Sequence, residues 1–380
     1  MTPSPASSSQ PIPGFATLEG TRRYAARFAG KAAAGYFREP GAVGLILSSI
    51  GIGTYLGEPD ETTDRGYADA AVAAVQGGIN LIDTAINYRF QRSERSVGAA
   101  LRKLVAGGIT REEIVLCTKA GFLTPDGELP ADAGDYFFRE YVETGIFRVD
   151  EVAAGCHCLA PGYLENQLER SLQNLGVACV DVFYLHNPET QLGEIPREDF
   201  RGRMDAAFHL LEAAVAAGKI RAYGLATWNA FRKAEDAPDY LSLAEMAGLA
   251  REVAGEGHHF RFVQLPFNLA MQEALTLPNQ TVENRKVSMV QAARPLGITL
   301  VASASLLQGQ LIQNLPPFVT QALGLSSDLE RALQFVRSAP GITTALVGMS
   351  RVEHVRANLA LLGVEPAPRD QFLQLFQQGR

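Results

Sequence analysis

The chain has 380 residues, of which 47% are hydrophobic and 20% are charged. This length can bury a large core, as one barrel of about 250 residues with additions or as two smaller domains. The formal net charge of -7 is modest and the basic residues form no stripe, so we expect no nucleic-acid partner.

The spacing of the cysteines and the length of the apolar runs indicate in which cellular compartment the protein works. The four cysteines are unevenly spaced and follow no secretory leader, a pattern typical of a reducing interior. The longest apolar runs fall well short of the roughly 20 residues that a membrane helix needs. The sequence therefore predicts a soluble, cytoplasmic protein without a membrane contact.

Three regions are expected along the chain. Residues 1–40 predict an N-terminal arm, partly disordered because residues 1–14 are rich in Ser and Pro, with a helical turn or two in residues 16–38. Residues 41–365 predict the main domain. Residues 366–380 predict a C-terminal tail.

The main domain alternates short apolar runs with segments of helical periodicity. The first run begins at Leu45 and leads into Gly53 and Thr54, where glycines permit a close approach of the backbone to a ligand. Seven further strands are expected at 80–83, 114–119, 180–186, 220–226, 262–265, 298–303 and 343–347. Helices are expected at 63–78, 93–104 with Ser93 as N-cap, 161–175, 205–217, 242–254, 287–296, 328–337 and 352–362.

Eight strands that are each followed by a helix predict a (β/α)8 TIM barrel. A doubly wound open sheet is the main alternative. However, no Gly-x-Gly-x-x-Gly follows the first strand, so a Rossmann cofactor site is not indicated.

A long insertion, residues 121–160, separates the third strand from its helix by far more than the usual few residues. It is rich in aromatic residues, namely Tyr136, Phe137, Phe138, Tyr141 and Phe147. Long loops at the catalytic face of a barrel often shape a pocket or a subunit contact. We expect this one to pack as a lid, with a disordered insertion as the alternative.

Polar side chains stand at the ends of three successive strands. Asp83 ends the second strand with Tyr88 five residues later, Lys119 ends the third and His186 ends the fourth. In a parallel barrel, chemistry gathers where strands end and turn into loops. These four residues are therefore expected to converge in one site.

This set of groups suits the reduction of a carbonyl, which needs a hydride on carbon and a proton on oxygen. A tyrosine, with a reference pKa near 10, is a poor acid at neutral pH. An ammonium about 4 Å away at an effective dielectric of about 20 favours the phenolate by roughly 4 kcal/mol, or about three pKa units, less the opposing desolvation. The sequence thus predicts that Lys119 lowers the pKa of Tyr88, that Asp83 keeps Lys119 charged and that His186 holds the substrate oxygen.

Other interpretations stay open for these residues. Taken singly, Asp83 fits a turn, Tyr88 fits core packing and His186 fits a structural role. Lys119 could instead be the Schiff-base amine of a carbon-carbon lyase. Cys156-His157-Cys158 could suggest a metal, but no second ligand pair at zinc-like spacing accompanies it, so loop packing is expected.

Three motifs carry a family resemblance. Asp83-Thr84-Ala85-x-x-Tyr88, Thr118-Lys119-Ala120-Gly121 and Leu185-His186-Asn187-Pro188 resemble, in order and approximate spacing, the catalytic tetrad motifs of the aldo-keto reductase superfamily. The resemblance extends over residues 45–362. It implies a (β/α)8 barrel, a nicotinamide cofactor bound without a Rossmann fold, and reversible reduction of a small-molecule carbonyl substrate. It also implies that Tyr88 is the general acid, that Lys119 and Asp83 tune it, and that His186 orients the carbonyl.

The same resemblance implies a set of cofactor-binding residues: Gly53, Thr54, Thr227, Gln264, Ser303, Leu306, Gly309, Ser350, Arg351, His354 and Asn358. Gln264 stands where the family holds the nicotinamide carboxamide. Ala226 and Thr227 replace the usual Ser-Asn pair, and Ser303 replaces the aromatic that stacks on the nicotinamide, a role left to Trp228 or Phe267.

The phosphate end of the expected cofactor site also departs from the family. Gly348 and His354 stand where a lysine and an arginine are common, which leaves Ser350, Arg351 and the start of the last helix to bind a phosphate. NADPH is expected, with NADH as the alternative. The altered contacts also leave open a family member kept as a nucleotide-binding regulatory or non-catalytic protein. Substrate identity and oligomeric state are not determined by the sequence.

Overall fold

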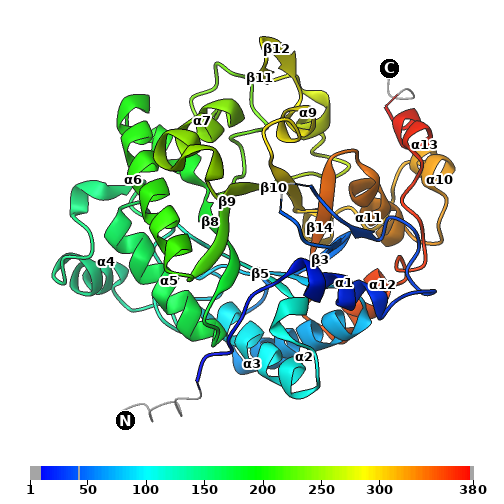
Figure 1. The fold of residues 1–380 in the computed structure, drawn as a ribbon, viewed down its shortest axis with the longest axis horizontal. Coiled ribbons are helices and arrows are strands. Elements are labelled where there is room, and N and C mark those ends of the chain that lie inside the picture. The colour runs from blue at the N-terminus through cyan, green and yellow to red at the C-terminus, as the bar shows by residue number, and fades with distance from the viewer. Residues whose placement is uncertain (1–9, 42, 377–380) are drawn as a thin grey trace.

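The computed structural model describes residues 10–41 and 43–376, and their centre is a closed barrel of eight parallel strands (Figure 1). The order around the barrel is β3-β4-β5-β8-β9-β10-β13-β14. The strands are β3 (Ile50–Gly53), β4 (Leu81–Asp83), β5 (Val115–Ala120), β8 (Val180–His186), β9 (Ile220–Ala226), β10 (Phe260–Pro266), β13 (Thr299–Ser303) and β14 (Ile342–Gly348). This confirms the (β/α)8 barrel and excludes the doubly wound sheet.

A helix follows each barrel strand and covers it from outside. These helices are α2 (Glu61–Gly77), α3 (Arg92–Ala106), α5 (Pro161–Leu175), α6 (Arg197–Ala216), α7 (Leu243–Ala254), α9 (Met289–Ala293), α11 (Asp328–Ser338) and α12 (Val352–Leu359). Local signals explain α5 well, because Pro161 opens it and Gly176 ends it with a left-handed φ of 66°. Its leucines 164, 168 and 175 are buried against the barrel.

Several expected boundaries were wrong. Ser93 is not the N-cap of α3, because a left-handed turn at residues 89–91 starts the helix at Arg92; the Ser93 hydroxyl instead donates to the Thr54 carbonyl oxygen at 2.8 Å. Helix α6 begins eight residues earlier than expected, at Arg197, since Phe200 and Met204 extend its buried face. The helix expected at 287–296 begins later, because Val287 belongs to a two-stranded hairpin formed by β11 (Gln280–Val282) and β12 (Arg285–Val287).

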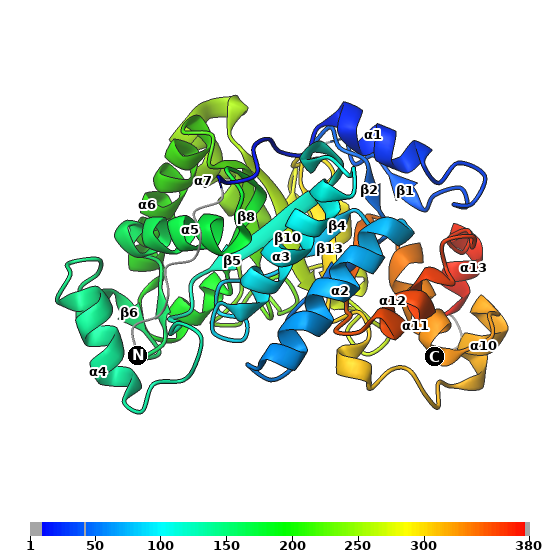
Figure 2. The ribbon, with the colours of Figure 1, turned by 90° about the horizontal axis from the view of Figure 1, so that it is seen from below.

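The N-terminal arm covers the end of the barrel where the strands begin. Helix α1 (Leu18–Ala26) and the pair β1 (Phe37–Arg38) and β2 (Leu47–Ser48) lie together at this end (Figure 2). The backbone N–H of Ala16 donates to the Asp181 carboxylate at 2.6 Å. The disorder expected for residues 1–14 is wrong for residues 10–14, since Ile12 forms a parallel bridge with Val177 and this part of the arm lies along the surface. Residues 1–9 fall outside the described residues.

The described part of the tail, residues 366–376, packs on the helix layer of the barrel. Helix α13 (Arg369–Gln374) buries Phe372, whose ring lies 5.2 Å from that of Phe335 on α11. Within residues 10–41 and 43–376, no helix is both long and apolar enough to cross a membrane.

The 121–160 insertion is ordered and does not form a lid. It contains α4 (Ala133–Phe137), a π-helical turn at Phe138–Val142, a 3-10 turn at Val149–Glu151, and the pair β6 (Val152–Ala153) and β7 (His157–Cys158). Both views place α4 at the outer edge of the molecule, beside the helix ring and not across the barrel mouth (Figures 1 and 2). The reason is that Phe137, Tyr141 and Phe147 pack in a separate core with Tyr163 of α5, whereas Phe138 is exposed.

Candidate active site

The four predicted side chains meet at the carboxyl end of the barrel. Asp83 ends β4, Lys119 lies in β5 and His186 ends β8, while Tyr88 follows β4 in the next turn. The Lys119 ammonium donates to Asp83 Oδ2 at 2.5 Å, to the Thr84 carbonyl oxygen at 2.8 Å and to the Tyr88 hydroxyl at 3.4 Å. The rings of Tyr88 and His186 are 5.8 Å apart, edge to face. The parallel register thus brings residues from three strands into one cluster.

Charge in this cluster is held by a buried ion pair. Burial raises the pKa of Asp83, and the Lys119 ammonium and the Gln264 amide oppose that rise. Burial alone would lower the pKa of Lys119, but the Asp83 carboxylate and Tyr88 raise it above its ordinary value. Lys119 is therefore a permanent cation at neutral pH.

The pKa of Tyr88 moves in the direction opposite to the one expected from the sequence. Desolvation by the surrounding protein raises the pKa of Tyr88, and the lowering by Lys119 does not cancel this rise. The expectation counted the ammonium as the larger effect, whereas burial is larger. Tyr88 consequently stays protonated at neutral pH, which is the state that a proton donor needs.

His186 is neutral. Desolvation, followed by the Lys119 charge and His157, holds the pKa of His186 well below its ordinary value. Its Nδ1 lies 3.2 Å from Oδ1 of Asn87, so Asn87 occupies one ring nitrogen and leaves Nε2 for another partner. Sequence reasoning missed Asn87, which lies inside the Asp83–Tyr88 motif but matches no motif position.

The floor of the site links the four residues to the expected cofactor residues. Gln264 donates to Asp83 Oδ1 at 2.7 Å, so both carboxylate oxygens of Asp83 are engaged. Thr54 is buried and donates to the Thr84 hydroxyl at 2.9 Å. Gly53 pairs with Asp83 on one side and Gly348 on the other. Gln264 and Thr54 are thus part of the scaffold that holds Asp83.

Two of the expected cofactor-binding residues have a buried polar side-chain atom without a hydrogen-bond partner among the described residues. Thr227 Oγ1 and Asn358 Oδ1 make no hydrogen bond to any group in the described part of the chain. A buried polar atom without a protein partner is available to hydrogen-bond a bound group. Both lie where the nicotinamide and adenosine ends of the cofactor are expected. The residues present therefore fit a nucleotide.

The residues expected to bind the phosphate lie at the start of α12. Arg351 is its N-cap residue, and among the described residues no side chain caps the free N–H groups of the first turn. Arg351 donates to His354 Nε2 at 3.0 Å, and burial, followed by the Arg351 charge, lowers the pKa of His354. His354 is thus a neutral acceptor that holds the exposed guanidinium, and Ser350 precedes the pair directly.

The residues expected around the nicotinamide lie in the loops after β9, β10 and β13. Ser303 ends β13, and Leu306 and Gly309 lie in the loop that follows it. Phe267 is fully buried and stacks on Phe335, with ring centroids 5.4 Å apart and planes 9° apart, so it faces away from the barrel mouth. Trp228, in the loop after β9, exposes 44% of its surface and is therefore the one of these two expected aromatics whose ring is open to a ligand.

Glu189 is a second residue that sequence reasoning missed. It lies in a 3-10 turn (Pro188–Gly193) after β8, is buried, and its Oε1 accepts from the backbone N–H groups of Trp228 at 2.7 Å and Asn229 at 3.0 Å. This carboxylate thereby shapes the loop that carries Thr227 and Trp228. The sequence shows an acidic residue three positions after His186, but it does not show that this residue binds the Trp228 backbone N–H, which lies 39 residues further along the chain.

We expect Glu189→Ala to weaken NADPH binding by about tenfold, or roughly 1.4 kcal/mol, because the β9 loop loses its fixed shape. Trp228 is the only tryptophan of the chain, so its fluorescence can report the affinity. Glu194→Ala, an exposed residue just after the same turn, is the control and should bind normally. Equal affinities for all three proteins would contradict the role of Glu189.

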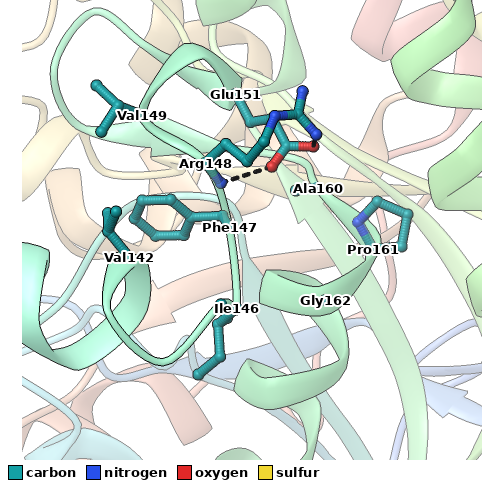
Figure 3. A pocket seen from close by; sticks show the side chains of 10 residues that line it. Val142, Ile146, Phe147, Arg148, Val149, Glu151, Ala160, Pro161 and Gly162 are labelled. Carbon is teal, nitrogen blue, oxygen red and sulfur yellow. Dashed lines mark hydrogen bonds and ion pairs between the residues drawn. The ribbon is translucent and has the colours of Figure 1, made fainter.

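Two open concavities lie away from this cluster, on the insertion. One, of about 460 Å³, is walled by Val142, Ile146 and Phe147 and by the start of α5, and Arg148 and Glu151 pair with each other on its wall (Figure 3). The other, of about 400 Å³, lies between the insertion and α6. Neither is lined by any of the four converging residues.

Comparison with known proteins assigns the family. The sequence profile of the Aldo/keto reductase family matches residues 49–376, and the chain therefore belongs to that family. It is 30% identical over 212 residues to the NADH-specific methylglyoxal reductase of Escherichia coli, across 54% of this chain and 55% of that protein. It is 27% identical over 199 residues to the 6-dehydroglucose reductase of Novosphingobium aromaticivorans, across 51% of this chain and 52% of that protein. The matched part thus spans about half the length of these curated relatives.

Solved structures share the fold. An aldo-keto reductase from Bacillus halodurans in its holo form aligns with a TM-score of 0.61 and 19% identity, over 90% of this chain and 96% of that one. An aldo/keto reductase from Klebsiella pneumoniae in complex with NADP and acetate aligns with a TM-score of 0.58 and 21% identity, over 88% and 92%. At these identities the likeness establishes the barrel architecture.

Proposed function

We propose that this protein reduces a small or medium aldehyde or ketone to the alcohol with NADPH, and that Tyr88 is the general acid. The observation that carries the proposal is the Lys119 ammonium, which contacts Asp83, Thr84 and Tyr88 in a buried cluster. The bound cofactor would supply the hydride for the carbonyl carbon. Tyr88 would donate its proton to the carbonyl oxygen, and Lys119 would stabilise the phenolate that remains.

His186 would orient the carbonyl through Nε2. A carbonyl oxygen accepts hydrogen bonds, so the reactive tautomer of the neutral imidazole carries its proton on Nε2. Nδ1 is then an acceptor, and Asn87 must present its amide N–H to it. In the structure Nδ1 faces Asn87 Oδ1, which only accepts, so this orientation of the amide places the proton on Nδ1. Turning the Asn87 amide over gives the reactive tautomer, and the Asn87 amide therefore selects the tautomer.

The Schiff-base lyase is the weaker candidate. A nucleophilic amine needs a free lone pair, which requires a lowered pKa. The pKa of Lys119 is raised, and three acceptors take up the three N–H groups of its ammonium. These contacts favour a fixed cation over a nucleophile.

The test of the proposed function is turnover of NADPH, followed by its near-ultraviolet absorbance, on a panel of aldehydes and ketones. The panel should include methylglyoxal and 6-dehydroglucose, the substrates named for the two curated relatives. NADPH consumption that requires a carbonyl supports the proposal. Tight nucleotide binding without turnover of any carbonyl would instead favour a non-catalytic, nucleotide-binding member of the family.

Cofactor preference is expected to depend on Arg351. We expect Arg351→Ala to weaken NADPH by about tenfold, or roughly 1.4 kcal/mol, and to leave NADH nearly unchanged, because only NADPH carries the additional phosphate. Titration calorimetry with both cofactors measures this. Arg356→Ala, an exposed arginine on the same helix, is the control. An equal loss for the two cofactors would reject the phosphate contact.

A further inference from the structure

His157 belongs to the insertion but contacts the main chain of His186. It is fully buried, and its Nε2 lies 2.7 Å from the His186 carbonyl oxygen. Since a carbonyl oxygen only accepts, His157 carries its proton on Nε2 and donates it. The Phe122 ring lies 5.0 Å from His157 and 5.2 Å from His186, edge to face with both, and so packs against both imidazoles.

The other face of His157 is also fixed. The Gln191 amide donates to Nδ1 of His157 at 2.8 Å, and Arg203 of α6 donates to Gln191 Oε1 at 2.5 Å. Arg203 in turn donates to the Glu151 and Asp150 carbonyl oxygens of the insertion, each at 2.9 Å. A hydrogen-bonded chain therefore runs from the surface of the insertion to the residue that closes β8.

Gly121 shows how closely these groups are packed. A Cβ atom at Gly121 would lie 2.7 Å from His157 Nε2 and 2.7 Å from the His186 carbonyl oxygen. Any side chain at position 121 would therefore push the two histidines apart. The Cys158 N–H also donates to the Gly121 carbonyl oxygen at 2.8 Å and keeps β7 at this position.

Burial, outweighing its bond to the His186 carbonyl, lowers the pKa of His157 to about 4. The imidazole is thus neutral over the physiological range and serves as a fixed donor, not as a titrating group. Among the described residues, no cluster of three or more His, Cys, Asp or Glu side chains could hold a metal, and both ring nitrogens of His157 are already engaged.

We infer that His157 is a positioning residue for His186, and that through it the 121–160 insertion sets the orientation of the imidazole that binds the substrate oxygen. The inference rests on the proposed reductase function. It gives the Cys156-His157-Cys158 motif a role in this site, since the histidine braces the end of β8 while Cys156 is exposed and Cys158 packs in the core of the insertion.

Kinetics of three variants test this inference. His157→Leu removes the donor, and kcat should fall by about 10- to 100-fold with an unchanged NADPH Kd, because a misplaced His186 binds the substrate oxygen poorly. His157→Gln keeps an N–H near the Nε2 position and should restore most of the loss. Cys156→Ala, the exposed neighbour, should match the wild type. Wild-type kcat in His157→Leu, or equal losses in the Leu and Gln variants, would overturn the inference.

Nitrogen-15 NMR of the histidine rings gives a readout that does not depend on turnover. In the His157→Leu variant the His186 ring signals should shift, and in His157→Gln they should return toward the wild type. Unchanged His186 signals in the Leu variant would reject the coupling even if the enzyme is active. Conversely, a wild type that turns over no carbonyl, with His186 signals that respond as expected, would remove the proposed function and keep the contact between the two histidines.

Discussion

Replacing Tyr88 with Phe is expected to abolish carbonyl reduction while NADPH still binds. The ring would keep its edge contact with Tyr55 at 5.0 Å and its place under the Lys119 ammonium, 4.9 Å from the ring centre. Only the hydroxyl, the proposed proton donor, is lost. Because general acid catalysis contributes about 100- to 10,000-fold, we expect a loss of that size in kcat, measured from NADPH absorbance in a single turnover.

Two controls distinguish the loss of the proton donor in Tyr88→Phe from general damage to the site. Trp228 fluorescence should report the same NADPH affinity in Tyr88→Phe and in the wild type. Tyr136→Phe removes a phenol from α4, outside the helix ring, and should keep wild-type turnover. If Tyr88→Phe turned over normally, Tyr88 would not be the acid.

The second large effect is expected from Lys119→Met. Lys119 and Asp83 are both buried, and removing one partner leaves a buried carboxylate without its counter-charge. Loss of one member of such a pair typically costs about 3–5 kcal/mol, so we expect the free energy of unfolding in urea to fall by roughly that amount. Turnover should fall as well, because the phenolate of Tyr88 would no longer be stabilised.

Two further variants test whether the broken ion pair causes the loss of stability in Lys119→Met. The double variant Asp83→Asn with Lys119→Met removes both charges and should recover much of the lost stability. Lys103→Met breaks the exposed pair with Asp69, at 2.8 Å, and should change the stability far less. A double variant that is less stable than Lys119→Met alone would mean that the ion pair is not the source of the loss.

The stability of Lys119→Met should also depend on pH. Without the ammonium, burial raises the folded-state pKa of Asp83 above its unfolded value, so the protonated carboxyl is favoured in the folded state. The stability is then greatest below the unfolded pKa and is lost as the pH rises through the folded pKa. Urea unfolding should therefore show the variant closer to the wild type under acidic conditions than at neutral pH.

The sequence by itself determined the barrel and the meeting of Asp83, Tyr88, Lys119 and His186. The spacing of apolar residues in a strand or helix, and the Pro and Gly residues that begin or end it, can be read from a short stretch of sequence. The strand at 180–186 and the helix at 161–175 were therefore predicted with correct ends. A parallel barrel then requires successive strand ends to lie side by side, so the motif order alone predicted the convergence.

Only the tertiary structure decided the rest. The direction of the Tyr88 pKa shift depends on how completely the protein excludes water, which no motif records. Glu189 and His157 act on groups 39 and 29 residues away, and such contacts exist only once the chain is folded. The insertion lies beside the barrel, not over it, because Tyr141 and Phe147 pack against Tyr163. The aromatic composition predicted burial but could not say which of these residues would be buried or against which surface.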